Sequence, residues 1–193
     1  MKVTKRIISI LLTLGILLTS IPVAAFEKPS GAEADLQNGY APTQDAYAIY
    51  PIPRNAQYAE GSFTLGTEIT VVSEEGIDAY TNQFLDEILT DYGRTKTVSE
   101  TIPEGTNQIL LGIKGSGGAV DAWAESNLTL SDAELFTKTD AYLIHANGGR
   151  IVILGKDTNA VYYGLATLQM MFSSFNGTKF LNVQIEDYAG MKM

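Results

Sequence analysis

The sequence contains no cysteine, one histidine and one tryptophan among 193 residues, and these shortages exclude several kinds of function. Without cysteine, no lipidated cysteine can anchor the protein, and an exported domain must be held together by its core alone. The single histidine, His145, argues against a multi-histidine metal site and against Ser-His or Cys-His catalysis. We expect His145 to occupy a sheet position in which a local hydrogen bond satisfies its ring.

Positive charge is also scarce, because 13 Lys and Arg residues stand against 22 Asp and Glu residues, a formal net charge of −9. Nucleic acids and anionic membrane surfaces are bound through basic footprints, so we expect neither as a partner. Solubility outside the cell is the simplest explanation for the acidity. The content of hydrophobic (45%) and charged (18%) residues is ordinary for one soluble globular domain.

Residues 1–25 have the three parts of a secretory signal peptide. Basic residues lie within 2–6, an apolar run spans 7–20, and small residues at 23–25 resemble a cleavage site. A permanent membrane anchor is the alternative, because the uncharged stretch 7–26 is long enough to span a bilayer. The cleavage-like end and the acidic, Pro- and Gly-containing sequence after it favour a cleaved signal. We therefore expect a secreted or cell-surface protein, exported in the bacterial manner.

Residues 26–48 are predicted to be a linker, because prolines and glycines are scattered through them without a sustained hydrophobic period. Tyr47 and the other aromatic residue of this segment, Tyr40, are too isolated to indicate a core. Regular hydrophobic patterning begins near Tyr50, and we assign residues 49–188 to a globular domain.

Hydrophobic spacing within this domain predicts two long helices and several strands. One helix is expected over 77–92, ended by Gly93, and a second begins at the N-cap Asp157. Asn147-Gly148-Gly149 is typical of a hairpin turn between two strands. Strands are expected over 68–72, 108–113, 140–146, 150–154 and 180–185. The predicted fold class is α+β, with a mixed sheet of four or more strands and two long helices packed on one face.

Adjacent carboxylates occur at 74–75, 86–87 and 186–187. Glycoside hydrolysis usually requires two carboxylates a fixed distance apart, and neighbours on a strand point to opposite faces. Glu186 and Asp187 therefore cannot converge on one bond, and we expect the other two pairs to lie on solvated surfaces. We predict no catalytic residue, no cofactor and no metal site in this chain.

Two further features have a structural and a functional interpretation. The glycine-rich run 114–118 could present amides to an anion, but it lacks nucleotide-binding spacing, so we expect a flexible loop. Trp123 lies in a polar, loop-like region, where it could stack on a sugar ring. Most of the 10 tyrosines occupy periodic positions and are expected in the core or in a domain interface.

The most informative stretch is 157–188, which contains the run YYGLATL and, after a loop, IEDY; the run YPIP opens the domain at Tyr50. This combination resembles the N-terminal, non-catalytic domain of β-N-acetylhexosaminidases. Glycoside hydrolase family 84, the O-GlcNAcase and hyaluronidase-like group, is favoured over family 20. The residues that carry the family motif are Tyr162, Tyr163, Gly164, Leu165, Leu168, Asp187 and Tyr188.

The resemblance implies that the last strand leads into a catalytic barrel and that residues 189–193 are its truncated start. It implies a parent enzyme that cleaves terminal β-linked N-acetylglucosamine from glycans with two barrel carboxylates absent from this chain. The chain alone is then expected to be an inactive fragment, with that barrel and such glycans as its partners. Asp187 would organise the junction. Similar domains also precede other barrels, so the resemblance identifies the domain better than the substrate.

Two alternatives remain open at this stage. The chain could be a free-standing exported carbohydrate-binding module, which its tyrosine content would suit. It could also be purely structural and brace a barrel by burying the tyrosine-bearing helix against it, which predicts an exposed apolar patch on the isolated domain.

Overall fold

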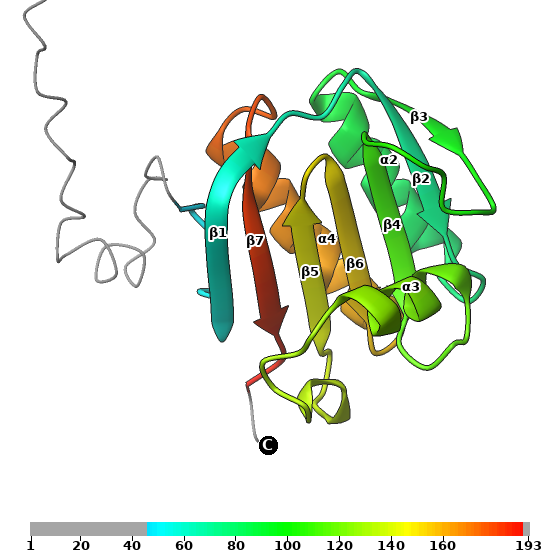
Figure 1. Cartoon of the computed structure of the whole chain (residues 1–193), viewed down its shortest axis with the longest axis vertical. Helices are drawn as coiled ribbons and strands as arrows, with labels where there is room; N and C mark the ends of the chain where they lie inside the picture. Colours follow the sequence, from blue (N-terminus) through cyan, green and yellow to red (C-terminus); the bar gives the residue numbers. More distant parts are fainter. Residues whose placement is uncertain (1–45, 191–193) are drawn as a thin grey trace, which may run out of the picture.

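A computed structural model describes residues 46–190, which form a seven-stranded sheet with helices on both faces (Figure 1). The predicted signal peptide, most of the predicted linker and the last three residues lie outside the described residues. None of the helices within 46–190 is long and apolar enough to cross a bilayer.

The sheet is mixed, as the sequence predicted, with strand order β1-β7-β5-β6-β4-β2-β3. β1, β7, β5 and β6 pair antiparallel, whereas β6, β4, β2 and β3 run parallel to one another. The strands are β1 (Asn55–Phe63), β2 (Glu68–Ser73), β3 (Thr95–Val98), β4 (Gln108–Ile113), β5 (Tyr142–Asn147), β6 (Arg150–Gly155) and β7 (Phe180–Asp187). The helices are α2 (Ala79–Asp91), α3 (Ala119–Asn127), α4 (Thr158–Ser174) and the 3-10 turn η1 (Leu135–Thr137).

The two long helices begin where a side chain satisfies the free amides of the first turn. The Asp78 carboxylate accepts from the Thr81 N–H at 2.7 Å, and that of Asp157 accepts from the Ala160 N–H at 3.0 Å. Both helices pack on one face of the sheet, behind it in Figure 1. The predicted arrangement of two long helices on one face is therefore confirmed.

The main core lies between this face of the sheet and the helices α2 and α4. Alternate residues of the inner strands point into it, such as Ile144 of β5 and Ile153 of β6, both without solvent exposure. Gly164 of α4 lies directly over β6, where an added Cβ would come within 2.6 Å of the Ile153 Cγ2 atom. The family-motif glycine therefore allows the helix to approach the sheet closely.

Four elements were not predicted: the edge strands β1 and β3, the helix α3 and the short 3-10 turn η1. Both edge strands are largely exposed and lack a continuous hydrophobic pattern. α3 covers the opposite face of the sheet, in front in Figure 1, where Val120 packs on Val72, Leu110 and Val152. Trp123 therefore belongs to a helix, and its assignment to a loop-like region is wrong.

Tyr47 lies in the segment expected to be a linker, yet it is one of the largest fully buried side chains. Its hydroxyl accepts from the Leu181 N–H at 2.6 Å and lies 3.3 Å from the Leu181 carbonyl oxygen. Its ring meets Phe175 edge-on, with centroids 5.6 Å apart. The core thus includes the chain immediately before β1.

Candidate domain-junction site

The chain leaves the sheet at Asp187, whose carboxylate contacts two other segments directly and a third through Tyr142. Its Oδ1 atom accepts from the backbone N–H of Arg54 at 3.1 Å, just before β1. Its Oδ2 atom accepts from the Tyr142 hydroxyl at 3.1 Å, and that hydroxyl also lies 2.7 Å from Thr167 Oγ1 on α4. Burial, followed by the charge of Asp187, raises the pKa of Tyr142 well above its usual range. Tyr142 therefore stays a neutral donor to Asp187.

Arg54 continues this arrangement along the outgoing chain. Its guanidinium lies over the Tyr188 ring, 5.3 Å from the centroid. An added Cβ at Gly190 would overlap the Arg54 Nη2 atom, so Gly190 passes directly against this side chain. The Ala189 N–H donates to the Thr139 carbonyl at 3.0 Å. Residues 187–190, which we call the exit segment, therefore leave the domain in a defined direction.

A groove of about 520 Å³ lies beside the exit segment. One wall is the YPIP run, and the other is the outer side of α4. Tyr50 is 73% exposed, Tyr163 48% and Ile52 39%, so the groove presents apolar surface to solvent. The Tyr50 N–H donates to the Met170 sulfur at 3.3 Å and holds the YPIP run against α4. The apolar residues of these two walls are Tyr50, Pro51, Ile52, Tyr163, Ala166 and Met170.

The structure separates the family-motif residues into two groups. Leu165 and Leu168 are fully buried between α4 and the sheet, so they belong to the core. Tyr163, Asp187 and Tyr188 all line the groove, although two of them lie more than twenty positions after the first. The motif thus includes residues that pack α4 on the sheet and residues that line the groove.

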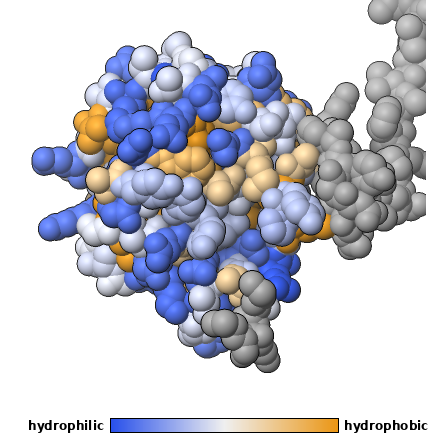
Figure 2. Space-filling view, turned by 180° about the vertical axis from the view of Figure 1, so that it is seen from behind, coloured by the Kyte–Doolittle hydropathy of each residue, from blue (hydrophilic) through white to orange (hydrophobic). Residues whose placement is uncertain are grey.

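Tyr162 lies on the outer side of the helix pair and joins α4 to α2 through aromatic stacking. Its ring centroid is 4.7 Å from that of Phe84 and 5.5 Å from that of Tyr80. Tyr163 meets it edge-on at 6.2 Å. Figure 2 views this helix side, where apolar residues form a band between hydrophilic regions.

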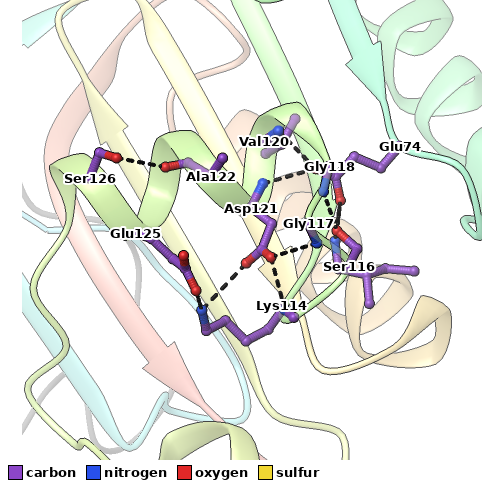
Figure 3. Close-up of polar contacts among 12 residues, drawn as sticks. Glu74, Lys114, Ser116, Gly117, Gly118, Val120, Asp121, Ala122, Glu125 and Ser126 are labelled. Atoms are coloured by element: carbon purple, nitrogen blue, oxygen red, sulfur yellow. Dashed lines mark hydrogen bonds and ion pairs between the residues drawn. The ribbon is translucent and has the colours of Figure 1, made fainter.

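The glycine-rich run after β4 is a fixed turn that opens α3, so the expected flexible loop is a wrong prediction (Figure 3). Glu74 Oε1 accepts from the N–H groups of Val120 and Asp121 at 2.7 and 2.8 Å. Its Oε2 accepts from the Ile113 N–H at 2.9 Å and from the Ser116 hydroxyl at 2.8 Å. The protein's own carboxylate thus occupies the place in which an anion would bind.

Glu74 is therefore buried, and its predicted place on a solvated surface is wrong. Asp121 completes the turn, because its Oδ2 accepts from the Gly115 and Gly117 N–H groups at 3.0 Å each. The pair 86–87 stays on the outer side of α2, where Lys96 forms an ion pair with Asp86 and Gln83 donates to Glu87.

The last acidic pair diverges, as strand geometry requires. Glu186 is 2% exposed and points away from Asp187, onto the opposite face of the sheet. Its carboxylate accepts from the N–H groups of Ser131 and Asp132 at 2.7 and 3.0 Å. Within residues 46–190, no three His, Asp or Glu side chains are grouped so that they could hold a metal ion.

His145 lies in the middle of β5, opposite Gln184 of β7. Burial lowers the pKa of its imidazole, and an interaction with the Gln184 side chain offsets part of that effect. Its Nδ1 atom has no hydrogen-bond partner among the described residues, so the expected local hydrogen bond does not involve this nitrogen. Trp123 is partly buried, with the Arg150 guanidinium 5.1 Å from its ring centroid.

The sequence profile of glycosyl hydrolase family 20, domain 2, matches residues 46–188. Among solved structures, CpGH84D is 37% identical and superposes with a TM-score of 0.71. CpGH84B is 22% identical (TM-score 0.53), and the β-N-acetylhexosaminidase of Bacteroides fragilis NCTC 9343 is 18% identical (TM-score 0.51), which shows a shared fold.

The matches cover 75%, 72% and 72% of this chain, but only 24%, 22% and 24% of those structures. This chain therefore spans about a quarter of the solved chains that it resembles. The matched region also begins at Ala46, so it contains the buried Tyr47. The resemblance read from the YYGLATL and IEDY runs is confirmed, and the chain belongs to the glycosyl hydrolase family 20, domain 2 family.

Proposed function

We propose that this chain is the accessory N-terminal domain of an exported β-N-acetylglucosaminidase or hexosaminidase. A catalytic barrel that follows residue 193 in the complete polypeptide would hydrolyse the O-glycosyl bonds of glycans. The match over residues 46–188 carries this proposal, because it belongs to a domain type found within hydrolases. The exit segment supports it, since residues 187–190 run past an open apolar groove rather than folding back into the core.

The 193-residue chain by itself should not hydrolyse glycosides. Its one acidic pair near the junction, Glu186 and Asp187, points to opposite faces of β7, and both carboxylates already accept backbone hydrogen bonds. Paired carboxylates facing one glycosidic bond are the usual requirement for this reaction. Catalysis is therefore assigned to the part of the polypeptide outside this chain.

The test compares two products of the same gene on 4-nitrophenyl N-acetyl-β-D-glucosaminide. The complete reading frame should release 4-nitrophenol, and the 193-residue chain should release none. Activity of the short chain would overturn the assignment of catalysis to a separate barrel. A downstream sequence without paired acidic residues would overturn the hydrolase assignment itself.

Export is the second part of the proposal, and residues 1–25 are its basis. The mature protein should begin near Phe26 and be found outside the cytoplasm. N-terminal sequencing of the extracellular product would check this, and a product that retains residues 1–25 in the membrane would instead indicate an uncleaved anchor.

A carbohydrate-binding module is the second candidate, favoured by the 73% exposure of Tyr50 and the 67% exposure of Tyr80. Aromatic rings open to solvent can stack on sugars. Calorimetric titration of the 193-residue chain with chitooligosaccharides would distinguish the two. Heat that disappears in a Tyr50→Ala or Tyr80→Ala variant would support sugar binding, and no heat at millimolar sugar would reject it.

A further inference from the structure

We infer that an aromatic strip across α2 and α4 is the surface on which the catalytic domain of the same polypeptide packs. This inference rests on the proposed function and names the contact that the accessory domain makes. The strip consists of Tyr50, Ile52, Tyr80, Phe84, Tyr162 and Tyr163.

The strip is continuous from one helix to the exit segment. Tyr80 and Phe84 of α2 stack on Tyr162 of α4, at centroid distances of 5.5 and 4.7 Å. Tyr162 contacts Tyr163 edge-on, and Tyr163 in turn lines the groove with the YPIP run. One apolar path therefore leads from the outer side of α2 to the place where the chain leaves the domain.

The exposure of these residues is unusual for side chains of their size. Within 46–190, six large hydrophobic side chains are exposed, and four of them, Tyr50, Ile52, Tyr80 and Tyr163, belong to the strip. The other two, Tyr58 and Val98, lie on the edge strands β1 and β3. Apolar surface gathered in one place, rather than scattered, marks an interaction surface.

The catalytic domain is the occupant that the geometry favours, because the exit segment forms one end of the groove. A domain that follows residue 193 would begin beside the strip and reach it without a long linker. The solved chains that contain this fold are about four times as long as the matched part, so each has a further part large enough to cover such a surface.

Charge distribution agrees with this occupant. The six strip residues are uncharged, and the charged side chains that line the groove, Arg54, Asp140 and Asp187, stand at its exit end. Two of them already have partners within the domain. Asp187 accepts a hydrogen bond from the Arg54 backbone N–H, and the Arg54 guanidinium lies over the Tyr188 ring. A partner therefore meets an apolar surface with charged groups at one end, and protein interfaces combine an apolar centre with polar groups at the edge.

The stacking within the strip favours a protein partner over a sugar. The Tyr162 ring already stacks on both Phe84 and Tyr80, so part of its face is used inside the strip. A sugar platform requires an open ring face, whereas a protein interface can pack on ring edges and on the backbone between them. The mutual stacking also fixes the side chains before binding, which lowers the entropy cost of ordering them.

The test uses the polypeptide encoded by the complete reading frame, with Tyr80→Ser and Tyr163→Ser introduced singly and together. The matched control is Val98→Ser, because Val98 is 65% exposed on β3, outside the strip. Limited proteolysis should cut the double variant after the exit segment about tenfold faster than the wild-type protein, the effect of losing central interface side chains. The control should be cut at the wild-type rate.

A second measurement uses the 193-residue chain, in which the strip would be uncovered. Sedimentation should show concentration-dependent self-association, and Tyr50→Ser or the double variant should shift the equilibrium toward monomer. Circular dichroism checks that each variant is folded. We expect the fold to be kept, because the substituted side chains are exposed. A monomeric wild-type chain, or an equal effect of Val98→Ser, would overturn the inference.

The outcomes separate this inference from the proposed function. A complete polypeptide that hydrolyses the N-acetylglucosaminide, but in which the double variant is cut at the control rate, would reject the strip and keep the function. A complete polypeptide without hydrolase activity would reject the function. Sugar titration that is lost in the Tyr80 variant, without a change in proteolysis, would assign the strip to glycan binding and also reject the inference.

Discussion

The Tyr142 hydroxyl donates to Asp187 across 3.1 Å and so links the centre of the sheet to the residue at which the chain leaves it. The same hydroxyl reaches Thr167 of α4 at 2.7 Å. A helix, a strand and the exit segment therefore share one buried phenol. The direction of the outgoing chain depends on the packed core rather than on surface contacts alone.

Tyr142→Phe should destabilise the domain by about 1–3 kcal/mol, because the buried Thr167 hydroxyl loses its partner and the half-buried Asp187 carboxylate loses one donor. Urea unfolding of the 193-residue chain would measure the change. Tyr163→Phe is the control, since Tyr163 is 48% exposed and its hydroxyl is not part of this network. Equal stabilities for the two variants would mean that the Tyr142 hydroxyl adds nothing beyond its ring.

Glu74→Gln should cost about 2–4 kcal/mol, because an amide has one acceptor oxygen where the carboxylate uses two. Depending on the orientation of the amide, either the Ile113 N–H or the two N–H groups at the start of α3 would then be left without an acceptor. The neighbouring Glu75→Gln should change stability by less than about 0.5 kcal/mol, since Glu75 is exposed. Chemical unfolding of both variants checks the contrast, and similar losses would show that charge alone matters.

Gly164→Ala should destabilise the domain by about 1–2 kcal/mol. The new Cβ would come within 2.6 Å of Ile153 Cγ2, and overpacking of a tight core typically costs about 1–3 kcal/mol. The higher helix propensity of alanine offsets at most about 1 kcal/mol of this loss. Thermal unfolding measures the net effect, and a rise in melting temperature would mean that α4 can move away from the sheet without loss.

Acid should destabilise the domain partly through His145. Burial holds its pKa in the folded state below the ordinary 6.5, so the unfolded chain takes up a proton more readily. Stability should therefore be intact above pH 6.5 and fall as the pH decreases below it. A His145→Gln variant should lose less stability between pH 7 and pH 5 in unfolding titrations. Parallel curves of unfolding free energy against pH for the wild-type protein and the variant would contradict this role of His145.

The predicted parts of the fold are those whose signals are local. Asp157 caps α4 three residues before its amide partner, and the Asn147-Gly148-Gly149 turn brings β5 and β6 together without help from distant residues. α3 was missed because its N-terminal amides are satisfied by Glu74, which lies more than forty positions earlier. β1 and β3 were missed because pairing, rather than hydrophobic alternation, holds an edge strand.

The contacts of the exit segment were predictable only in part. The IEDY run identified Asp187 and Tyr188, but not Arg54 or Tyr142, which the pairing of β1, β7 and β5 brings to them. The YPIP run and Tyr163 were identified in the sequence, but the groove between them was not, because Tyr50 and Tyr163 lie about 110 positions apart and only the fold brings them together. The stacking of Tyr80 on Tyr162 likewise requires the side-by-side placement of α2 and α4.

The burial of Tyr47 sets a practical limit on how this unit can be excised. An expression product that starts at residue 49, where the hydrophobic pattern becomes regular, would lack Tyr47. It would lose the packing of the Tyr47 ring against Phe175 and both contacts of the Tyr47 hydroxyl with Leu181. Such a void costs about 3–5 kcal/mol in a typical interior, a large part of the margin by which small proteins stay folded. Grafting or crystallising the unit therefore requires a start no later than Ala46.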